Sequence, residues 1–288
     1  RIEEGGLVVE LFAHPAANLA LVHNGVPLIT ALSIRNTSNQ DAIDVQASVQ
    51  LFGRGHPISP EFDEVIDGPL APGSAFQWDN FAEVVPEVDH LQELNESYPA
   101  TIYVSVKHLW SRPIQLKVPI RVLAHNEWFN APIYYSSLSA FVQPNTRAVS
   151  SVLAIASTLL EKQTGNSSLG GYQSGPERAA YIAGAVYEAL RSKGIRYISP
   201  PASFEQSGQK IRTTAQVLEE RFGTCIDLAV TYAACLEAAG LRPVLWLKQG
   251  HAFAGFMREE TNLASATVTD TNTMVNLVES NTVVPVEA

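Results

Sequence analysis

The stretch Arg221-Phe222-Gly223-Thr224-Cys225-Ile226-Asp227 decides the fold of the C-terminal half, because it places a cysteine in the first turn of a predicted helix. That helix runs from Cys225 to Ala239 and stops at Gly240. At a helix start, unpaired backbone N–H groups and the positive end of the dipole favour a thiolate. The N–H of Cys225 can also face an oxyanion on a substrate carbonyl, and Gly223 allows a tight entry with space for a substrate backbone. Cys225 is therefore the candidate nucleophile.

The second cysteine, Cys235, lies in mid-helix between Ala234 and Leu236, where a small buried residue that only packs is expected. The same packing role is the alternative for Cys225. Ten positions along one helix correspond to a rise of roughly 15 Å, too far for the two thiols to bridge each other. Two cysteines are also too few for a disulfide scaffold, and no secretory signal opens the chain, so a reducing cytoplasm is expected.

A candidate base follows on the next strand. His251 comes directly after Lys248-Gln249-Gly250 and opens the apolar run His251–Phe256, so its imidazole can point toward a helix N-terminus. Taken alone, such a histidine is more often structural. The other six histidines are scattered, and neither they nor the cysteines form a pair at metal-ligand spacing. We expect neither a metal nor a cofactor.

The elements around this segment predict an α+β domain over residues 146–288, with helices first and strands afterwards. A loop rich in glycine and serine, Gly165–Gly175, separates the first two helices, and Thr213 or Thr214 caps a third short one before the Cys225 helix. The apolar positions of the first helix are Val149, Val152, Leu153, Ala156, Leu159 and Leu160; the second helix spans 176–193. Four strands of one antiparallel sheet are expected at Val244–Leu247, His251–Phe256, Thr273–Val278 and Thr282–Val286.

The first half follows a different periodicity. Short runs rich in β-branched and aromatic residues alternate with turn clusters, which predicts an antiparallel, Ig-like β-sandwich over residues 1–124. The expected strands are Leu7–Phe12, Ala31–Asn36, Val45–Phe52, Ala75–Trp78, Thr101–Trp110 and Ile114–Val122, with one short helix near Val88–Asn95. Residues 125–145, with Pro132, Pro144 and several aromatics, are expected to connect the two domains and to pack onto both.

The order of these features resembles the transglutaminase-like members of the papain-like superfamily. Gly223–Asp227 opens a helix that ends in Ala239-Gly240-Leu241-Arg242-Pro243, and a strand then leads to Gly250-His251-Ala252-Phe253. In that superfamily the cysteine begins a helix and the histidine lies on the following sheet. The resemblance therefore assigns nucleophile and base to Cys225 and His251. Asp227 matches a recurrent acidic position, for which favourable charge in the first helical turn is preferred over a chemical role.

The resemblance also suggests two further site residues. A catalytic imidazole needs an acceptor on its far nitrogen, and transglutaminase-like domains supply it at the end of the adjacent strand. Val284-Pro285-Val286-Glu287 has the expected apolar-Pro-apolar-acid form, with glutamate where aspartate is usual, so Glu287 is preferred over Asp270, which lies in a predicted loop. Gln209 is the candidate side-chain donor to the oxyanion, because papain-like sites often use a glutamine upstream of the cysteine. A surface glutamine is the alternative.

Further motifs resemble a bacterial domain of unknown function found at the front of very large proteins that carry a superfamily I helicase. They include Gly171–Ser174, Ile198–Phe204, Gly208–Lys210 and Phe141–Asn145, together with the sandwich segments His23–Leu28 and Leu32–Asn36. The resemblance covers nearly the whole chain and implies that it is the N-terminal part of a helicase-type polypeptide, whose helicase region is a partner. The sequence has no Gly-x-x-x-x-Gly-Lys-[Ser/Thr] phosphate loop.

Charge argues against direct nucleic-acid binding. The net charge is −10, and residues 1–122 hold 15 acidic against 7 basic residues, whereas residues 123–288 hold 14 against 12. A negatively charged first half repels the phosphate backbone of a nucleic acid. One basic cluster stands out, and we expect it to be a solvated face; it comprises Arg191, Lys193, Arg196, Lys210 and Arg212, relieved by Glu205. No apolar run approaches the length of a membrane span.

Two functions remain open from the sequence. The first is a thiol hydrolase or acyl-transferase of the peptidase, amidase or transglutaminase-like kind, acting on a peptide or protein amide. The second is a non-catalytic recognition module beside a helicase. An intact cysteine and histidine favour the first, since a binding platform needs neither.

Overall fold

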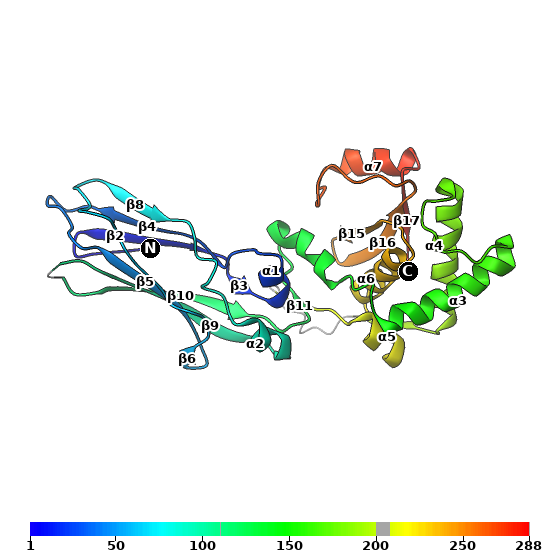
Figure 1. Ribbon diagram of the computed structural model, residues 1–288, viewed down its shortest axis with the longest axis horizontal. Helices are drawn as coiled ribbons and strands as arrows, with labels where there is room; N and C mark the ends of the chain where they lie inside the picture. Colours follow the sequence, from blue (N-terminus) through cyan, green and yellow to red (C-terminus); the bar gives the residue numbers. More distant parts are fainter. Residues whose placement is uncertain (110, 200–207, 288) are drawn as a thin grey trace. The chain divides into compact units, whose positions relative to one another are not determined.

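The computed structural model describes residues 1–109, 111–199 and 208–287 (Figure 1). It divides into two compact units, Arg1–Phe129 and Asn130–Ala288, each with its own sheets and helices. The boundary between them falls inside the predicted connector, residues 125–145. Most of the Ile198–Phe204 motif lies outside the described residues, as does Glu205.

The first unit contains two sheets. One is antiparallel, in the order β1-β2-β4-β8: β1 (Ile2–Glu4), β2 (Leu7–Ala13), β4 (Ile29–Asn36) and β8 (Ala75–Trp78). The other has the order β3-β10-β9-β5-β6, with β7 also paired to β5: β3 (Ala16–Ala17), β10 (Ile114–Val122), β9 (Tyr98–Lys107), β5 (Gln46–Gly53), β6 (His56–Pro57) and β7 (Phe62–Val65). The short β3 runs parallel to β10, so this sheet departs from the wholly antiparallel one expected.

Residues of both sheets enter one core. Alternate positions of β5, such as Val49 and Leu51, are fully buried, and they share the core with Ile34 of β4 and Ile102 of β9. This period of two is what a strand with one buried face requires. The remaining elements of the unit are short: α1 (Leu19–His23), α2 (Val88–Glu93) and β11 (Glu127–Trp128).

The second unit begins with a 3-10 helix, η1 (Pro132–Phe141), and four α-helices follow: α3 (Arg147–Thr164), α4 (Gly175–Ser192), α5 (Thr214–Glu220) and α6 (Cys225–Ala238). Thr146 caps α3 by accepting from the N–H of Val149, and Gly165 ends it in the left-handed conformation. The buried stripe of α3 packs with α4 and α6, as the 3.6-residue spacing predicts. Three two-residue strands lie between these helices: β12 (Arg196–Tyr197), β13 (Gln209–Lys210) and β14 (Phe222–Gly223), of which β12 and β14 pair in parallel.

A three-stranded antiparallel sheet follows, in the order β15-β16-β17: β15 (Pro243–Lys248), β16 (His251–Met257) and β17 (Val283–Val286). Ala254 and Phe256 of β16 share a core with α6, whereas Val244, Met257 and Val283 pack with Leu277 on the opposite face. Helices therefore cover both faces of this sheet.

The predicted strand Thr273–Val278 is wrong: these residues lie in a helix, α7 (Thr271–Glu279). Threonine and valine favour strands, but Asp270 accepts a hydrogen bond from the N–H of Thr273 and so caps a helix here. Two of its apolar residues, Met274 and Leu277, stand three positions apart, which suits one helical face. The sheet accordingly has three strands rather than four.

Tyr172 fixes the direction of β16 along α6. Its hydroxyl accepts from the N–H of Arg242 and donates to the carbonyl of Met257, at 2.9 and 2.7 Å. Arg242 follows closely on the end of α6, so β16 finishes at the C-terminal end of that helix. Close by, Gly171 contacts Gly240 backbone to backbone: a Cβ on Gly171 would stand 2.5 Å from the Gly240 carbonyl oxygen. Both glycines have positive φ, 57° and 78°.

Candidate active site

Cys225 is the first residue of α6 and is partly exposed. Thr224 is the N-cap residue, and its backbone N–H donates to the carboxylate of Asp227 at 2.9 Å. The Asp227 carboxylate therefore supplies one half of a capping box, which fixes the entry of the chain into the helix, whereas the Thr224 hydroxyl makes no hydrogen bond among the described residues. The thiol stands at the first residue of the helix, where backbone N–H groups have no intrahelical partner.

Asp227 is fully buried, and its carboxylate is held by Arg212. The backbone N–H of Arg212 donates to one carboxylate oxygen at 2.8 Å and its guanidinium to the other at 3.1 Å. The guanidinium also lies 4.7 Å from the ring centre of Phe222 and pairs with Glu220. Because all these contacts are internal, Asp227 is a positioning residue for the start of α6, in keeping with the non-chemical role preferred from the sequence.

Gly223 contributes close packing. A Cβ on this residue would stand 3.1 Å from the Cβ of Asp227 and 3.3 Å from a methyl group of Leu228. The space expected for a substrate backbone on that side is therefore filled by α6 itself. The glycine is needed for the tight approach of β14 to the helix.

His251 and Glu287 form the polar pair that the sequence predicts. The Nε2 atom of His251 lies 2.8 Å from a carboxylate oxygen of Glu287, the residue directly after β17. The histidine side chain is 35% exposed and that of the glutamate 67%. Exposed pairs of this kind contribute only about 0.2–1 kcal/mol, so the contact serves more to orient the ring than to stabilise the fold.

Aromatic rings support the imidazole from one side. The ring of His251 stacks on Phe253 with a centroid distance of 5.8 Å, and Phe253 stacks on Trp246 of β15 at 5.6 Å with nearly parallel planes. Residues two apart on a strand share a face, so these rings lie opposite the face that carries Ala254. The imidazole stands at the margin of the sheet, at the first residue of β16.

The lengths of β16 and α6 can be compared, because the two elements pack on each other. The helix rises about 21 Å over 14 residues, and β16 covers about 23 Å over seven. Because β16 ends beside Arg242 and packs along α6, its first residue lies toward the N-terminal end of that helix. By strand alternation, however, His251 belongs to the sheet face opposite α6, the face that packs with Leu277 of α7. Within the described residues, no hydrogen bond joins the thiol to the imidazole. Such bonds are often long in unliganded sites.

Gln209 is tied by the backbone to the residue that holds Asp227. It lies in β13, three residues before Arg212, whose N–H is bound to Asp227. Three residues span at most about 11 Å, so the backbone of Gln209 stays close to the anchored Arg212. Asp270, the alternative acid, instead bonds to the N–H and hydroxyl of Thr273 at the start of α7.

The remaining predicted features occupy separate places. Cys235 is fully buried in α6, and burial raises the pKa of its thiol to about 12. In the basic cluster, Arg191 pairs with Glu188 and Arg212 with Asp227, so two of its charges are neutralised within the unit. The sequence interpretation missed the Arg212 anchor, the aromatic stack and the Tyr172 bridge. The capping-box spacing was a visible signal for the first; the other two have no local sequence signature.

Within the described ranges, no helix is long and apolar enough to span a membrane, and no three His, Cys, Asp or Glu side chains gather as a metal site would require.

No protein-family profile and no curated protein matches the sequence. Among solved structures, the chain is similar to the crystal structure of a family 76 glycoside hydrolase from a bovine Bacteroides thetaiotaomicron strain. The identity is 5% and the TM-score 0.19, over 66% of this chain and 39% of that one. The match thus spans less than half of that structure, and so low a score carries no argument about fold or activity.

Proposed function

We propose that the second unit is a thiol enzyme that acts on an amide bond, with Cys225 as nucleophile, His251 as base and Glu287 as the acceptor that orients the imidazole. The observation that carries this proposal is the hydrogen bond between His251 and Glu287, which supports it together with the position of Cys225 at the start of α6. A nucleophile, a base and an orienting acid are the three parts that such chemistry needs.

The reaction follows from these roles. The sulfur of Cys225 attacks the amide carbonyl carbon, and its proton passes to His251. The C–N bond then breaks, and the imidazolium returns the proton to the departing amine. Water, or an amine in the transferase form of the reaction, attacks the resulting thioester and regenerates the thiol. The N–H of Cys225 and the side chain of Gln209 are the proposed donors to the oxyanion.

The test is labelling with a thiol-directed acyl probe, comparing the native chain with the His251→Ala variant. Labelling of Cys225 that falls at least tenfold in the variant supports a nucleophile–base pair. Equal labelling of both proteins would show that the histidine does not activate the thiol. The Cys225→Ala variant serves as the blank.

A recognition module attached to a helicase is the second candidate. The observation in its favour is that the thiol and the imidazole make no hydrogen bond within the described part of the chain. A binding platform requires only the fold, so it predicts that Cys225→Ala leaves partner binding unchanged.

The wider context belongs to the same proposal. We assign the first unit as an Ig-like β-sandwich because its two sheets enclose one core. The second unit is assigned as transglutaminase-like on its cysteine-led helix followed by a sheet that carries the histidine. We propose a cytoplasmic location from the small number of cysteines, and a place at the front of a helicase-type polypeptide from the resemblance stated from the sequence.

A further inference from the structure

β15 forms one edge of the three-stranded sheet. It pairs with β16 on one side, and within the described residues no strand pairs with its other side. A free edge presents unpaired backbone donors and acceptors, which proteins usually cover or interrupt. Here the edge is six residues long, about 20 Å.

The register shows which backbone groups point outward. The N–H of Met257 donates to the carbonyl of Arg242, so alternate residues from Arg242 onward face β16. The N–H and carbonyl groups of Leu245 and Leu247 therefore point to the open edge. Nothing in the described part of the chain hydrogen-bonds to them.

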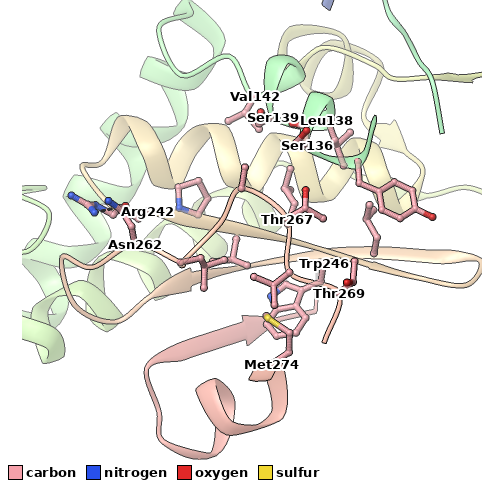
Figure 2. Close-up of a pocket in the computed structure, with 18 of the residues that line it drawn as sticks. Ser136, Leu138, Ser139, Val142, Arg242, Trp246, Asn262, Thr267, Thr269 and Met274 are labelled. Carbon is pink, nitrogen blue, oxygen red and sulfur yellow. Dashed lines mark hydrogen bonds between the residues drawn. The ribbon is translucent and has the colours of Figure 1, made fainter. Parts of the chain in front are cut away.

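A groove of about 860 Å³ follows this edge. All six residues of β15 line it, and since successive strand residues face opposite sides of a sheet, only a groove along the edge can touch all of them. Leu138, Ser139 and Val142, at the end of η1, form one wall, and the segment from Asn262 to Met274 forms the other (Figure 2).

The walls decide what fits. If a second copy of the protein paired through its own β15, the walls beside the two strands would collide. A single extended peptide can enter between the two walls. The lining is mainly apolar, with small hydroxyl side chains such as Ser136 and Thr267. At the far end stands Lys248, which is exposed and makes no ion pair among the described residues, while Arg242 at the near end is occupied by Glu260 and Asn262.

The geometry points to a peptide-binding site: this groove takes an extended peptide that adds to β15 as a fourth, antiparallel strand. The peptide alternates apolar and small residues and has an acidic residue at the end that meets Lys248. Main-chain hydrogen bonds to Leu245 and Leu247 bind the peptide, and contacts between its side chains and the two walls determine specificity. The groove does not include Cys225 and peptide binding there does not depend on the proposed chemistry, although Trp246 belongs both to the groove and to the aromatic stack that includes His251.

Binding is measured by fluorescence anisotropy with the labelled peptide acetyl-Glu-Val-Thr-Val-Ser-Val-amide, using the Cys225→Ala variant of the whole chain so that no cleavage interferes. In an antiparallel arrangement its N-terminal glutamate meets Lys248. Because main-chain bonds are insensitive to sequence, we expect saturable binding with a dissociation constant below about 1 mM.

Two variants of Leu247, one of them to proline, test the edge. Leu247→Pro removes an outward N–H without removing a ladder hydrogen bond, a position that tolerates proline. We expect a loss of at least tenfold in affinity, against less than threefold for the matched variant Leu247→Thr, which keeps the N–H. Thermal unfolding of both variants checks the fold.

The peptide itself supplies a control that no folding defect can affect. Two probes are compared, one N-methylated at alternate residues and the other at the residues between. Only one of the two sets faces β15, so one probe should bind and the other should not. Equal binding of both probes, equal losses in the Pro and Thr variants, or no saturable binding by 1 mM would each overturn the proposal, as would self-association that competes with the probe.

Discussion

The two cysteines of α6 have the same side chain, ten residues apart in one helix, and different surroundings. Cys225 opens the helix beside a buried polar network and is partly exposed, whereas Cys235 lies in the apolar core. Burial raises the pKa of the Cys235 thiol to about 12. Position in the helix, and not residue type, therefore separates a thiol available for chemistry from one that only packs.

The largest effect is expected in alkylation. Burial raises the pKa of the Cys235 thiol to about 12 and shields it from reagents, so it holds little thiolate at neutral pH. Iodoacetamide should therefore modify the partly exposed Cys225 far faster than Cys235, by at least about tenfold, as peptide mass spectrometry of the folded protein measures. Addition of urea should remove the difference. Equal rates in the folded protein would sink the nucleophile assignment.

The polar network at the helix start can be broken by Asp227→Ala. This change removes a cap and leaves Arg212 without its buried partner, so we expect a loss of about 2–3 kcal/mol in the free energy of unfolding. The matched control is Glu177→Ala, which removes an exposed acid from the first turn of α4 and should cost less than about 1 kcal/mol. Urea unfolding measures both variants. Similar losses of unfolding free energy in Asp227→Ala and Glu177→Ala would show that the buried contacts of Asp227 add no stability beyond that of an exposed acid.

A smaller effect concerns the orienting acid. Glu287→Gln should slow acylation of Cys225 about tenfold, because the amide no longer stabilises the imidazolium as a carboxylate does. Asp270→Asn should leave acylation unchanged and affect only the cap of α7. The measurement is the rate of probe incorporation. Slower acylation in Asp270→Asn, with Glu287→Gln unaffected, would reverse the assignment.

The smallest effect is expected from duplex DNA. Arg191 and Arg212 are already paired, so two of the five cations of the basic cluster are engaged by acidic side chains, and the net charge of the chain is −10. At physiological salt the dissociation constant for duplex DNA should stay above about 1 µM. Such a value is no tighter than ordinary non-specific binding. Submicromolar binding with a steep salt dependence, measured by anisotropy of a labelled duplex, would identify this cluster as a nucleic-acid site.

The sequence predicted elements whose residues act locally. α6 has nearly the predicted bounds, because a threonine N-cap residue and a glycine stop mark its two ends, and β8 has the predicted bounds. The strand predicted at 273–278 is wrong because the Asp270 cap, four residues before Met274, outweighs the strand propensity of threonine and valine in this segment. In the candidate site, the contact between His251 and Glu287 followed from a family pattern. The Tyr172 bridge joins residues 70 and 85 positions apart, which no local pattern reports.

The contact between Gly171 and Gly240 has a consequence for sequence evolution. Neither position accepts a side chain, since each has a positive φ and Gly171 touches the carbonyl of Gly240. Relatives that keep this packing should therefore retain both glycines even where the nucleophile is lost. The glycine pair would then mark descent of the fold, and the cysteine at position 225 would separately mark retention of the chemistry.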